Sequence, residues 1–280
     1  LAGSTTGTLP FAGTVGGAGS GGEVTVEHSG DIATFGAGAH GIVAQSAGGR
    51  GTASDVTVTV DGRVYTLGSG SIGVVLQSHG EFGNGDLSLE LASGGVIFGG
   101  TGTGTAVRFL DGATNRLLNR GSILTSDRLA GTAIVGGSLD EHVRNDGVIV
   151  GSIELGAGHN SLENKGTGVL LTGAHIGLGA GNVLTNAGWL APGSFGSIAA
   201  TVIDGNLVNT PTAVQWFDVD MTGQRADSLV VQGDYTADGV VNLLFVSPLK
   251  ATHQAYELVS VQGQTIDDGL LLSTFEMPVI

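Results

Sequence analysis

The sequence predicts an all-β fold, a parallel β-helix in which one chain winds as a single-stranded solenoid, and three observations support this prediction. One pattern, Leu-Gly-Ala-Gly-(His)-Asn-x-Leu-x-Asn-x-Gly, occurs over residues 155–166 and returns over residues 178–188. Apolar residues alternate with polar or small ones over short runs, which is the period of a strand with one buried face. The 280 residues include 52 glycines, and each glycine inside an α-helix costs about 1 kcal/mol relative to alanine. A unit of about 22 residues cannot bury its own apolar face, so successive units must stack as coils.

A second repeat organises the N-terminal part of the chain. Residues 30–51 align without a gap on residues 62–83, ten of the aligned positions are identical, and a weaker third copy starts near Gly94. We interpret each copy as one coil with an outward loop, and the loop candidates are residues 48–55 and 79–86. Over the whole chain we expect eight or nine coils.

An asparagine recurs at one position of the later coils. The motif apolar-x-Asn-x-Gly repeats at roughly the length of one coil, and its asparagines are Asn119, Asn145, Asn164 and Asn186. Asparagine suits the corner of a coil because its amide can hydrogen-bond to the next coil. The glycine two positions further on permits a tight or positive-φ bend. We therefore predict a structural asparagine ladder at one corner of the stack.

The composition changes after Pro192, which divides the chain into residues 1–190 and residues 191–280. Glycine falls from 44 in residues 1–190 to 8 in the remainder. We interpret the first part as β-helix coils with outward loops and the second as a C-terminal β cap. A stable end unit can template the coils that stack on it and can cover an open strand edge. The aromatic core predicted for this cap consists of Trp216, Phe217, Tyr235, Phe245 and Tyr256.

Composition and charge restrict the possible partners. The formal net charge of −15 disfavours nucleic acid, because binding to phosphates requires clustered Lys and Arg. The chain has no cysteine, which excludes disulfide frameworks and thiolate chemistry. No apolar run reaches the roughly 18 residues of a membrane-spanning helix, so no transmembrane segment is expected. No signal peptide is expected after Leu1 either, and we interpret the chain as a piece of a longer precursor.

Three stretches resemble the passenger of a Gram-negative autotransporter, the type V secretion class with a pertactin-like β-helix. The copies that contain GIVAQSAGGRG and GVVLQSHG are similar to the glycine-rich repeats of large passengers. LGAGNVLTNAGWLAPGSFG resembles the last passenger coils, and the stretch from VIDGNLV to AYELVSVQG resembles the autochaperone region that precedes the translocator barrel. The resemblance covers most of residues 30–265, and residues 184–262 are its most specific part.

The resemblance implies a right-handed helix and a role at the cell surface. A passenger of this class is exported through its own outer-membrane β-barrel translocator, which this chain does not contain. It then stays attached to the outer membrane of a Gram-negative bacterium or is secreted. The expected function is that of an adhesin or a self-association module in aggregation and biofilm, with host surfaces, matrix or identical passenger molecules as partners. The C-terminal region is expected to template folding of the β-helix during secretion.

Two matches to the dinucleotide-binding motif Gly-x-Gly-x-x-Gly occur, at residues 36–41 and 68–73. That motif requires a helix to begin after the glycines, whereas the strand-like runs IVAQS and VVLQS follow here. We therefore predict that both matches are turns. No Gly-x-Ser-x-Gly signature of a protease or an esterase occurs in the chain.

Asp140 and Glu141, beside His142, are the best candidates for carbohydrate chemistry, because glycosidases use paired carboxylates as acid and base. We favour a solvated loop between coils, since no second matched acidic cluster occurs. A group of aspartates makes a calcium site a second hypothesis, and such a site needs several converging oxygen ligands. The alternation of apolar residues with the first two instead predicts the solvent-exposed face of a strand; the group is Asp218, Asp220, Asp227, Asp234 and Asp238.

The sequence thus indicates a protein that is not an enzyme, and we expect no catalytic residue, cofactor or metal ligand. The seven histidines are scattered and lack the HExxH spacing of a zinc helix. Two other functions remain open. One is an enzyme that acts on polysaccharide through Asp140 or Glu141, and the other is a passive stalk for a functional head upstream of Leu1.

Overall fold

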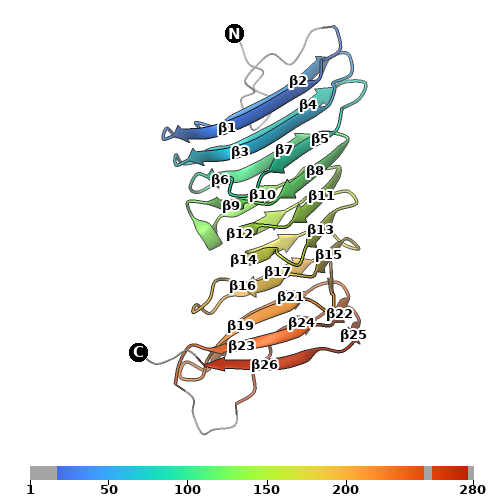
Figure 1. Cartoon of the computed structure of the whole chain (residues 1–280). Helices are drawn as coiled ribbons and strands as arrows, with labels where there is room; N and C mark the ends of the chain where they lie inside the picture. Colours follow the sequence, from blue (N-terminus) through green and yellow to red (C-terminus); the bar gives the residue numbers. More distant parts are fainter. Residues whose placement is uncertain (1–17, 249–253, 277–280) are drawn as a thin grey trace.

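The computed structural model describes residues 18–248 and 254–276, and strands form most of this part of the chain. Twenty-six strands belong to one continuous sheet, and the one helical element among the described residues is the short 3-10 helix η1 (Arg128–Ala130). The strands are stacked as the rungs of an elongated column, with β1 near one end and β26 near the other (Figure 1). The prediction of an all-β parallel β-helix is therefore confirmed.

Each coil contributes one strand segment to each of three parallel rows. The first row consists of β1 (Val24–Thr34), β3 (Val56–Thr66), β5 (Leu87–Leu91), β8 (Thr114–Asn119), β11 (Asp140–Asn145), β13 (Ser161–Asn164), β15 (Val183–Asn186), β18 (Asn206–Asn209), β22 (Tyr235–Ala237) and β25 (Thr265–Asp267). These ten strands enclose nine complete coils, which agrees with the expected eight or nine.

The second row follows the first around a corner of each coil. It begins with the second halves of β1 and β3 and continues with β6 (Val96–Gly99), β9 (Ser122–Thr125), β12 (Val148–Glu154), β14 (Val169–Gly177), β16 (Trp189–Pro192), β19 (Val214–Asp220), β23 (Val240–Phe245) and β26 (Leu271–Glu276).

The third row closes each coil before the chain returns to the first. It consists of β2 (Ile42–Gly49), β4 (Ile72–Gly80), β7 (Thr105–Asp111), β10 (Thr132–Val135), the ends of β12 and β14, β17 (Ala200–Asp204), β21 (Ser228–Val231) and β24 (Val259–Val261). The short strand β20 (Arg225–Ala226) stands outside the rows and pairs antiparallel with β19.

The register follows the repeat seen in the sequence. The β1–β3 ladder pairs Gly30 with Gly62 and keeps the same offset from Val24↔Val56 to Thr34↔Thr66, which is the alignment of the two N-terminal copies. The longer coils are not explained by loops alone, because β1 and β3 are each 11 residues long and pass through two rows without a break. Further along, the coils become shorter, and His142 pairs with Ser161. The extra length of the first coils is therefore divided between longer strands and the segments that join the second row to the third, which are residues 35–41 and 67–71.

The interior is a stack of branched apolar side chains. Inward residues of the first row lie one above the other, and those from successive coils are Val58, Leu89, Leu117, Val143, Leu162, Leu184 and Leu207. All seven are at most 2% exposed. No single coil could remove these side chains from water, so each depends on the coils above and below it.

The three rows continue past residue 190 without interruption. Trp189 of β16 pairs with Val214 of β19, and His175 of β14 pairs with Val202 of β17. The region from residue 191 onward therefore adds further coils to the same sheet. In the last coil, Ile266, Leu271 and Leu272 are 56–68% exposed, so the final described rung is itself an open edge.

Replacing Leu162 by alanine should lower the free energy of unfolding by about 2–5 kcal/mol, because the cavity lies between two flanking coils that cannot collapse freely. Thr185 lies on the next coil but faces outward, and Thr185→Ala should change the stability by less than about 0.5 kcal/mol. Urea unfolding followed by circular dichroism measures both values. Equal losses in the two variants would contradict a packed interior at Leu162.

Candidate functional site

The four predicted asparagines lie in register at the corner between the first and second rows. Their side chains form a continuous chain in which the Nδ2 group of each donates to the Oδ1 atom of the next. The distances are 2.7 Å for Asn119 to Asn145, 2.8 Å for Asn145 to Asn164, and 2.8 Å for Asn164 to Asn186. All four side chains are fully buried. The ladder therefore satisfies interior polar groups and is out of reach of an external ligand.

The ladder has a fifth member that the sequence motif misses. Asn186 donates to Asn209 at 3.1 Å, and Asn209 donates to the hydroxyl group of Tyr235 at 3.2 Å. Tyr235 in turn donates to Gln215 at 2.7 Å. Pro211 stands where the motif requires glycine, which hides Asn209 from the pattern, although Asn209 follows Asn186 by about the length of one coil.

The corner glycines serve close packing and not a positive φ. A Cβ atom on Gly147 would lie 2.2 Å from the carbonyl oxygen of Gly121, and one on Gly121 would lie 2.2 Å from that of Gly95. Neither residue is among those with positive φ. The predicted need for glycine at this corner thus has a different cause, which is the contact between successive coils.

The five aromatic residues predicted as a cap core occupy different environments. Phe217 and Tyr235 face the interior and are at most 4% exposed. Trp216 lies on the outer side of β19, where its ring centroid is 5.8 Å from that of Trp189 and 5.5 Å from that of Phe195. The remaining two, Phe245 and Tyr256, are half-buried. The five side chains therefore do not form one core, because neighbouring positions of a strand point to opposite faces.

Two of the aspartates considered for calcium are buried, which corrects the expectation of a solvent-exposed face for Asp218. Asp218 and Asp227 are each 2% exposed. Asp218 accepts a hydrogen bond from the backbone N–H of Ser197 at 2.7 Å, and Asp227 accepts bonds from the backbone N–H groups of Ala199 at 2.7 Å and of Asp218 at 2.8 Å. The loop of residues 193–199 covers both carboxylates and supplies two of these donors.

Burial governs the protonation of this pair. Desolvation raises the pKa of Asp227 to about 7, although the backbone hydrogen bonds act in the opposite direction. Desolvation raises the pKa of Asp218 as well. Within residues 18–248 and 254–276, no three or more His, Cys, Asp or Glu side chains converge as the ligands of a metal ion. Backbone amides therefore surround the two carboxylates.

Asp140 and Glu141 belong to strand β11 and not to a solvated loop. Glu141 is fully buried, accepts hydrogen bonds from Asn115 at 2.9 Å and from the Gly137 N–H at 2.8 Å, and has its pKa raised by burial. Asp140 faces the other side of the strand, where it accepts a bond from the backbone of His159 at 2.8 Å. Two carboxylates on opposite faces of a strand cannot flank one glycosidic bond, so Asp140 and Glu141 do not form an acid–base pair.

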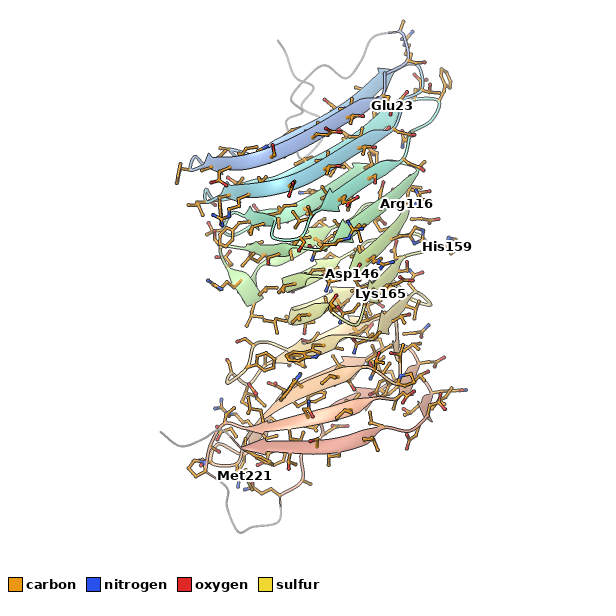
Figure 2. All side chains as sticks on the ribbon, viewed as in Figure 1. Glu23, Arg116, Asp146, His159, Lys165 and Met221 are labelled. Carbon is orange, nitrogen blue, oxygen red and sulfur yellow. The ribbon has the colours of Figure 1, made fainter. Side chains whose placement is uncertain are left out.

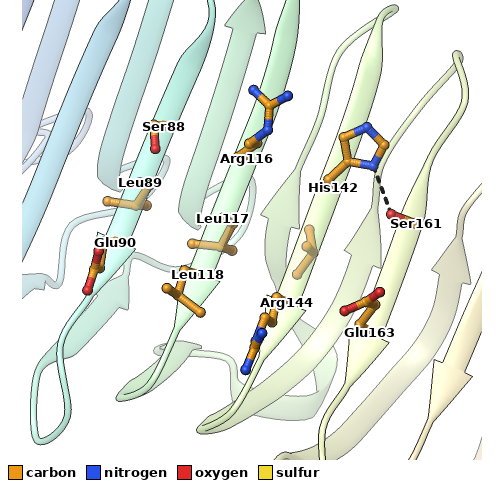
Figure 3. A pocket seen from close by; sticks show the side chains of 11 residues that line it. Ser88, Leu89, Glu90, Arg116, Leu117, Leu118, His142, Arg144, Ser161 and Glu163 are labelled. Carbon is orange, nitrogen blue, oxygen red and sulfur yellow. Dashed lines mark hydrogen bonds between the residues drawn. The ribbon is translucent and has the colours of Figure 1, made fainter.

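A shallow groove of about 450 Å³ lies on the outer surface of the first row (Figure 3). Strands β5, β8, β11 and β13 each contribute two outward side chains, in register: Ser88 and Glu90, Arg116 and Leu118, His142 and Arg144, and Ser161 and Glu163. The imidazole Nδ1 atom of His142 lies 2.8 Å from the hydroxyl oxygen of Ser161. The groove is open, and apolar as well as polar side chains line it.

Basic residues are concentrated around this groove. The chain contains ten Lys and Arg residues, and four of them, Arg116, Arg120, Arg144 and Lys165, lie on or beside the strands that line it. Figure 2 shows Arg116 and Lys165 on the same side of the stack. Each base has an acidic neighbour, such as Asp86 at 3.1 Å from Arg116 and Asp146 at 2.7 Å from Arg144. The hydrogen bond that Arg144 donates to Asp146 raises the pKa of Arg144. The groove is therefore bordered by a band of paired charges.

A second surface feature, which we call the outer apolar face, covers the outside of the second row. Outward positions of β6, β9, β12, β14, β16 and β19 are apolar and partly or largely exposed: Val96, Phe98, Leu124, Val148, Val150, Val169, Leu171, Trp189, Val214 and Trp216. Ser122 and Ala191 fill the two remaining positions. The signal was present in the sequence, because runs such as Val148-Ile-Val150 and Val169-Leu-Leu171 are apolar at every position and do not alternate.

The other sequence candidates fall on turns and loops. The first Gly-x-Gly-x-x-Gly match lies between β1 and β2, and the second runs into the start of β4, so a strand stands where a dinucleotide site would need a helix. The predicted recognition loops join the third row to the first, and Phe82 in one of them is 74% exposed. Within the described part of the chain, no helix has the length and hydrophobicity that crossing a membrane would require.

Comparison of the chain with protein-family models, curated proteins and solved structures found no match in any of the three. The surface features above therefore rest on the geometry of this chain alone.

Asn145→Ala should lower the free energy of unfolding by about 3 kcal/mol or more. The change breaks the ladder on both sides of this position and leaves buried donors on Asn119 and Gly147 unsatisfied, each at a cost of about 1–3 kcal/mol. Asn206 lies at another corner and is half-buried, so Asn206→Ala should cost no more than about 1.5 kcal/mol. Denaturant unfolding of both variants tests this difference. An equal loss in the free energy of unfolding would show that the ladder stabilises the fold no more than an ordinary corner hydrogen bond does.

Stability should rise as the pH falls from about 7 toward about 4, with a slope of at most about 1.4 kcal/mol per pH unit for one coupled proton. Asp227 has a pKa raised to about 7 in the folded chain, whereas the ordinary pKa of its carboxyl group is 3.8. Between these two pH values the folded state therefore binds a proton that the unfolded state releases. Burial lowers the pKa of His40 and opposes this trend at the acidic end.

The variant Asp227→Asn isolates the contribution of Asp227, because His40 is the same in both proteins. Thermal unfolding of the two proteins between pH 5 and pH 8 should give a smaller pH dependence for the variant. Identical pH dependence would contradict the assignment.

Proposed function

We propose that this chain is part of an autotransporter passenger that is displayed at, or released from, the surface of a Gram-negative bacterium and acts as an adhesin or self-association module. Its partners are host surfaces, matrix or identical passenger molecules, and its own outer-membrane β-barrel translocator exports it. The resemblance of residues 30–265 to passengers of this class motivates the proposal. The stacked coils support it, because a solenoid presents an extended surface whose outward side chains are not needed for folding.

The groove with its paired charges is the observation that carries the adhesive function. The chain has a formal net charge of −15, yet Arg116, His142 and Arg144 stand together on adjacent strands that line one groove. Each of these side chains faces solvent and none contributes to the apolar interior. Exposed Arg and His side chains around an open groove can donate hydrogen bonds to the hydroxyl or carboxylate groups of a glycan or an acidic protein.

The C-terminal coils support a role in templating. A parallel coil can form only against an existing edge, because its backbone hydrogen bonds run to the preceding or following coil. Strands β23 and β26 pair from Val240↔Leu271 to Phe245↔Glu276, which offers a longer edge than the short first-row strands in the middle of the stack, such as β13 and β15. In a chain that emerges progressively from a translocator, such an edge would order each new coil in turn.

Bacteria that display this chain should aggregate or attach to host matrix more strongly than bacteria without it, and the double variant Arg116→Glu with Arg144→Glu should reduce attachment to matrix about tenfold or more. This factor corresponds to the loss of roughly 1.4 kcal/mol. The matched control, Arg128→Glu with Arg225→Glu, makes the same charge change at exposed positions outside the groove.

Attachment and aggregation counts at equal surface expression measure the effect. If cells with the native chain attach and aggregate no better than bare cells, the proposed function is wrong. Equal losses in both variants would mean that net charge, and not the groove, determines attachment.

A further inference from the structure

The strands of the second row have the sequence of strands that are covered on both sides. Parallel strands buried on both faces read as continuous apolar runs, whereas strands with one wet face alternate. In β12, Ile149 faces the core and is 1% exposed, while its neighbours Val148 and Val150 face outward and remain partly exposed. The same holds for Val169 and Leu171 around Leu170 in β14. These strands therefore have the sequence of a sheet that a second layer covers, and the described part of the chain does not supply that layer.

The charges of the molecule avoid this surface. The first two outward positions of β6, β9, β12, β14, β16 and β19 hold no Asp, Glu, Lys or Arg. The corresponding positions of the first row include Glu90, Arg116, Arg144 and Glu163. In a chain with a formal net charge of −15, the outer apolar face is thus a side on which two like-charged molecules can meet without apposing carboxylates.

We propose that the outer apolar face packs against the same face of a second copy of this chain, sheet against sheet. This inference rests on the proposed function, since it names the surface through which identical molecules associate. A second copy is the partner that fits best, because its strands have the same spacing of about 4.8 Å and can match this sheet coil for coil. Such a contact is symmetric, with one patch used by both molecules.

An aromatic cluster supplies the anchor of this contact. Trp189 and Phe195 are 43% and 44% exposed, and their rings pack with Trp216, whose centroid lies 5.8 Å from that of Trp189. Large aromatic side chains dominate the binding energy of most interfaces. The buried carboxylates of Asp218 and Asp227 hold the loop that carries Phe195 in place, so the cluster is ordered before a partner arrives.

The size of the face indicates a weak contact. Six strands with about 4.8 Å between neighbours and four residues of about 3.3 Å each give a flat area of roughly 400 Å², about half of what each partner buries in a stable interface. One pair of molecules would therefore dissociate readily. Many copies on two apposed cells would still hold, because multivalent display multiplies weak contacts.

Sedimentation and tryptophan emission of the purified chain test the proposal over rising concentration, up to about 1 mM, where a contact of roughly −4 kcal/mol would be half formed. Both tryptophans of the chain lie on this face, so association should shift their emission to shorter wavelength as water leaves the interface. Raising the salt concentration from about 0.05 to about 0.5 M should strengthen the association, because salt screens the repulsion between two acidic molecules.

The variant Val148→Lys with Val169→Lys places two charges on the outer apolar face and should weaken the association tenfold or more. Its matched control, Val183→Lys with Val208→Lys, makes the same change at half-buried outward positions of the first row and should leave association intact. Circular dichroism and the thermal midpoint verify that each variant is folded. If the lysines at 148 and 169 prevent folding, Val148→Thr with Val169→Thr keeps the shape of each side chain, and the same loss of association is expected in smaller measure.

Four results would overturn the proposal: a native chain that stays monomeric throughout, association that salt weakens, equal effects of the two lysine variants, or a native chain that is monomeric alone but shifts its emission on neutral phosphatidylcholine vesicles. The last result would make lipid the partner. Failure of the proposed function would give a different set of results. Cells that display the chain would then not attach, while the purified chain would still associate through this face.

Discussion

The in-register hydrogen bonding of each coil to the next is the constraint on which the rest of this structure depends. Parallel pairing fixes the distance between coils at about 4.8 Å, and this distance places like side chains on top of one another along the whole stack. Leu162 lies between Val143 and Leu184 for this reason. The same spacing brings Asn145 within hydrogen-bond distance of Asn164. Apolar burial and polar satisfaction therefore follow from one geometric repeat.

Much of the fold could be predicted because the repeat is written into the sequence at positions that face inward. The offset between the two N-terminal copies, which aligns Gly30 with Gly62, is the register of β1 on β3. The apolar-x-Asn-x-Gly motif marks one corner of successive coils. Asn209 was missed because Pro211 interrupts the motif. The division at residue 190 describes a change in composition, whereas the hydrogen-bonded rows pass through it.

The candidate site was harder to predict, because the outward positions of a solenoid carry no repeat that the fold requires. Burial of Asp218 depends on a loop of residues 193–199 that folds back over β19, and a strand pattern does not reveal such a cover. Glu141 takes a place among buried corner amides, where Asn115 and Asn160 are its neighbours in the adjacent coils, and its type alone suggested a wet loop. The groove becomes visible only when Ser88, Arg116, His142 and Ser161 from four coils are placed in register.

The length of a coil varies widely while its register does not. One turn of the chain leads from Val24 to Val56 in the first coil but only from His142 to Ser161 in a later one. The third-row strand β2 is longer than the end of β12 that takes its place, and the other residues lie at the corner where the second row passes to the third, residues 35–41 in the first coil. This corner can therefore accept or lose several residues without disturbing a neighbouring coil. A solenoid of this kind can renew the loops that it shows to its surroundings, generation after generation, while its column of leucines and asparagines stays unchanged.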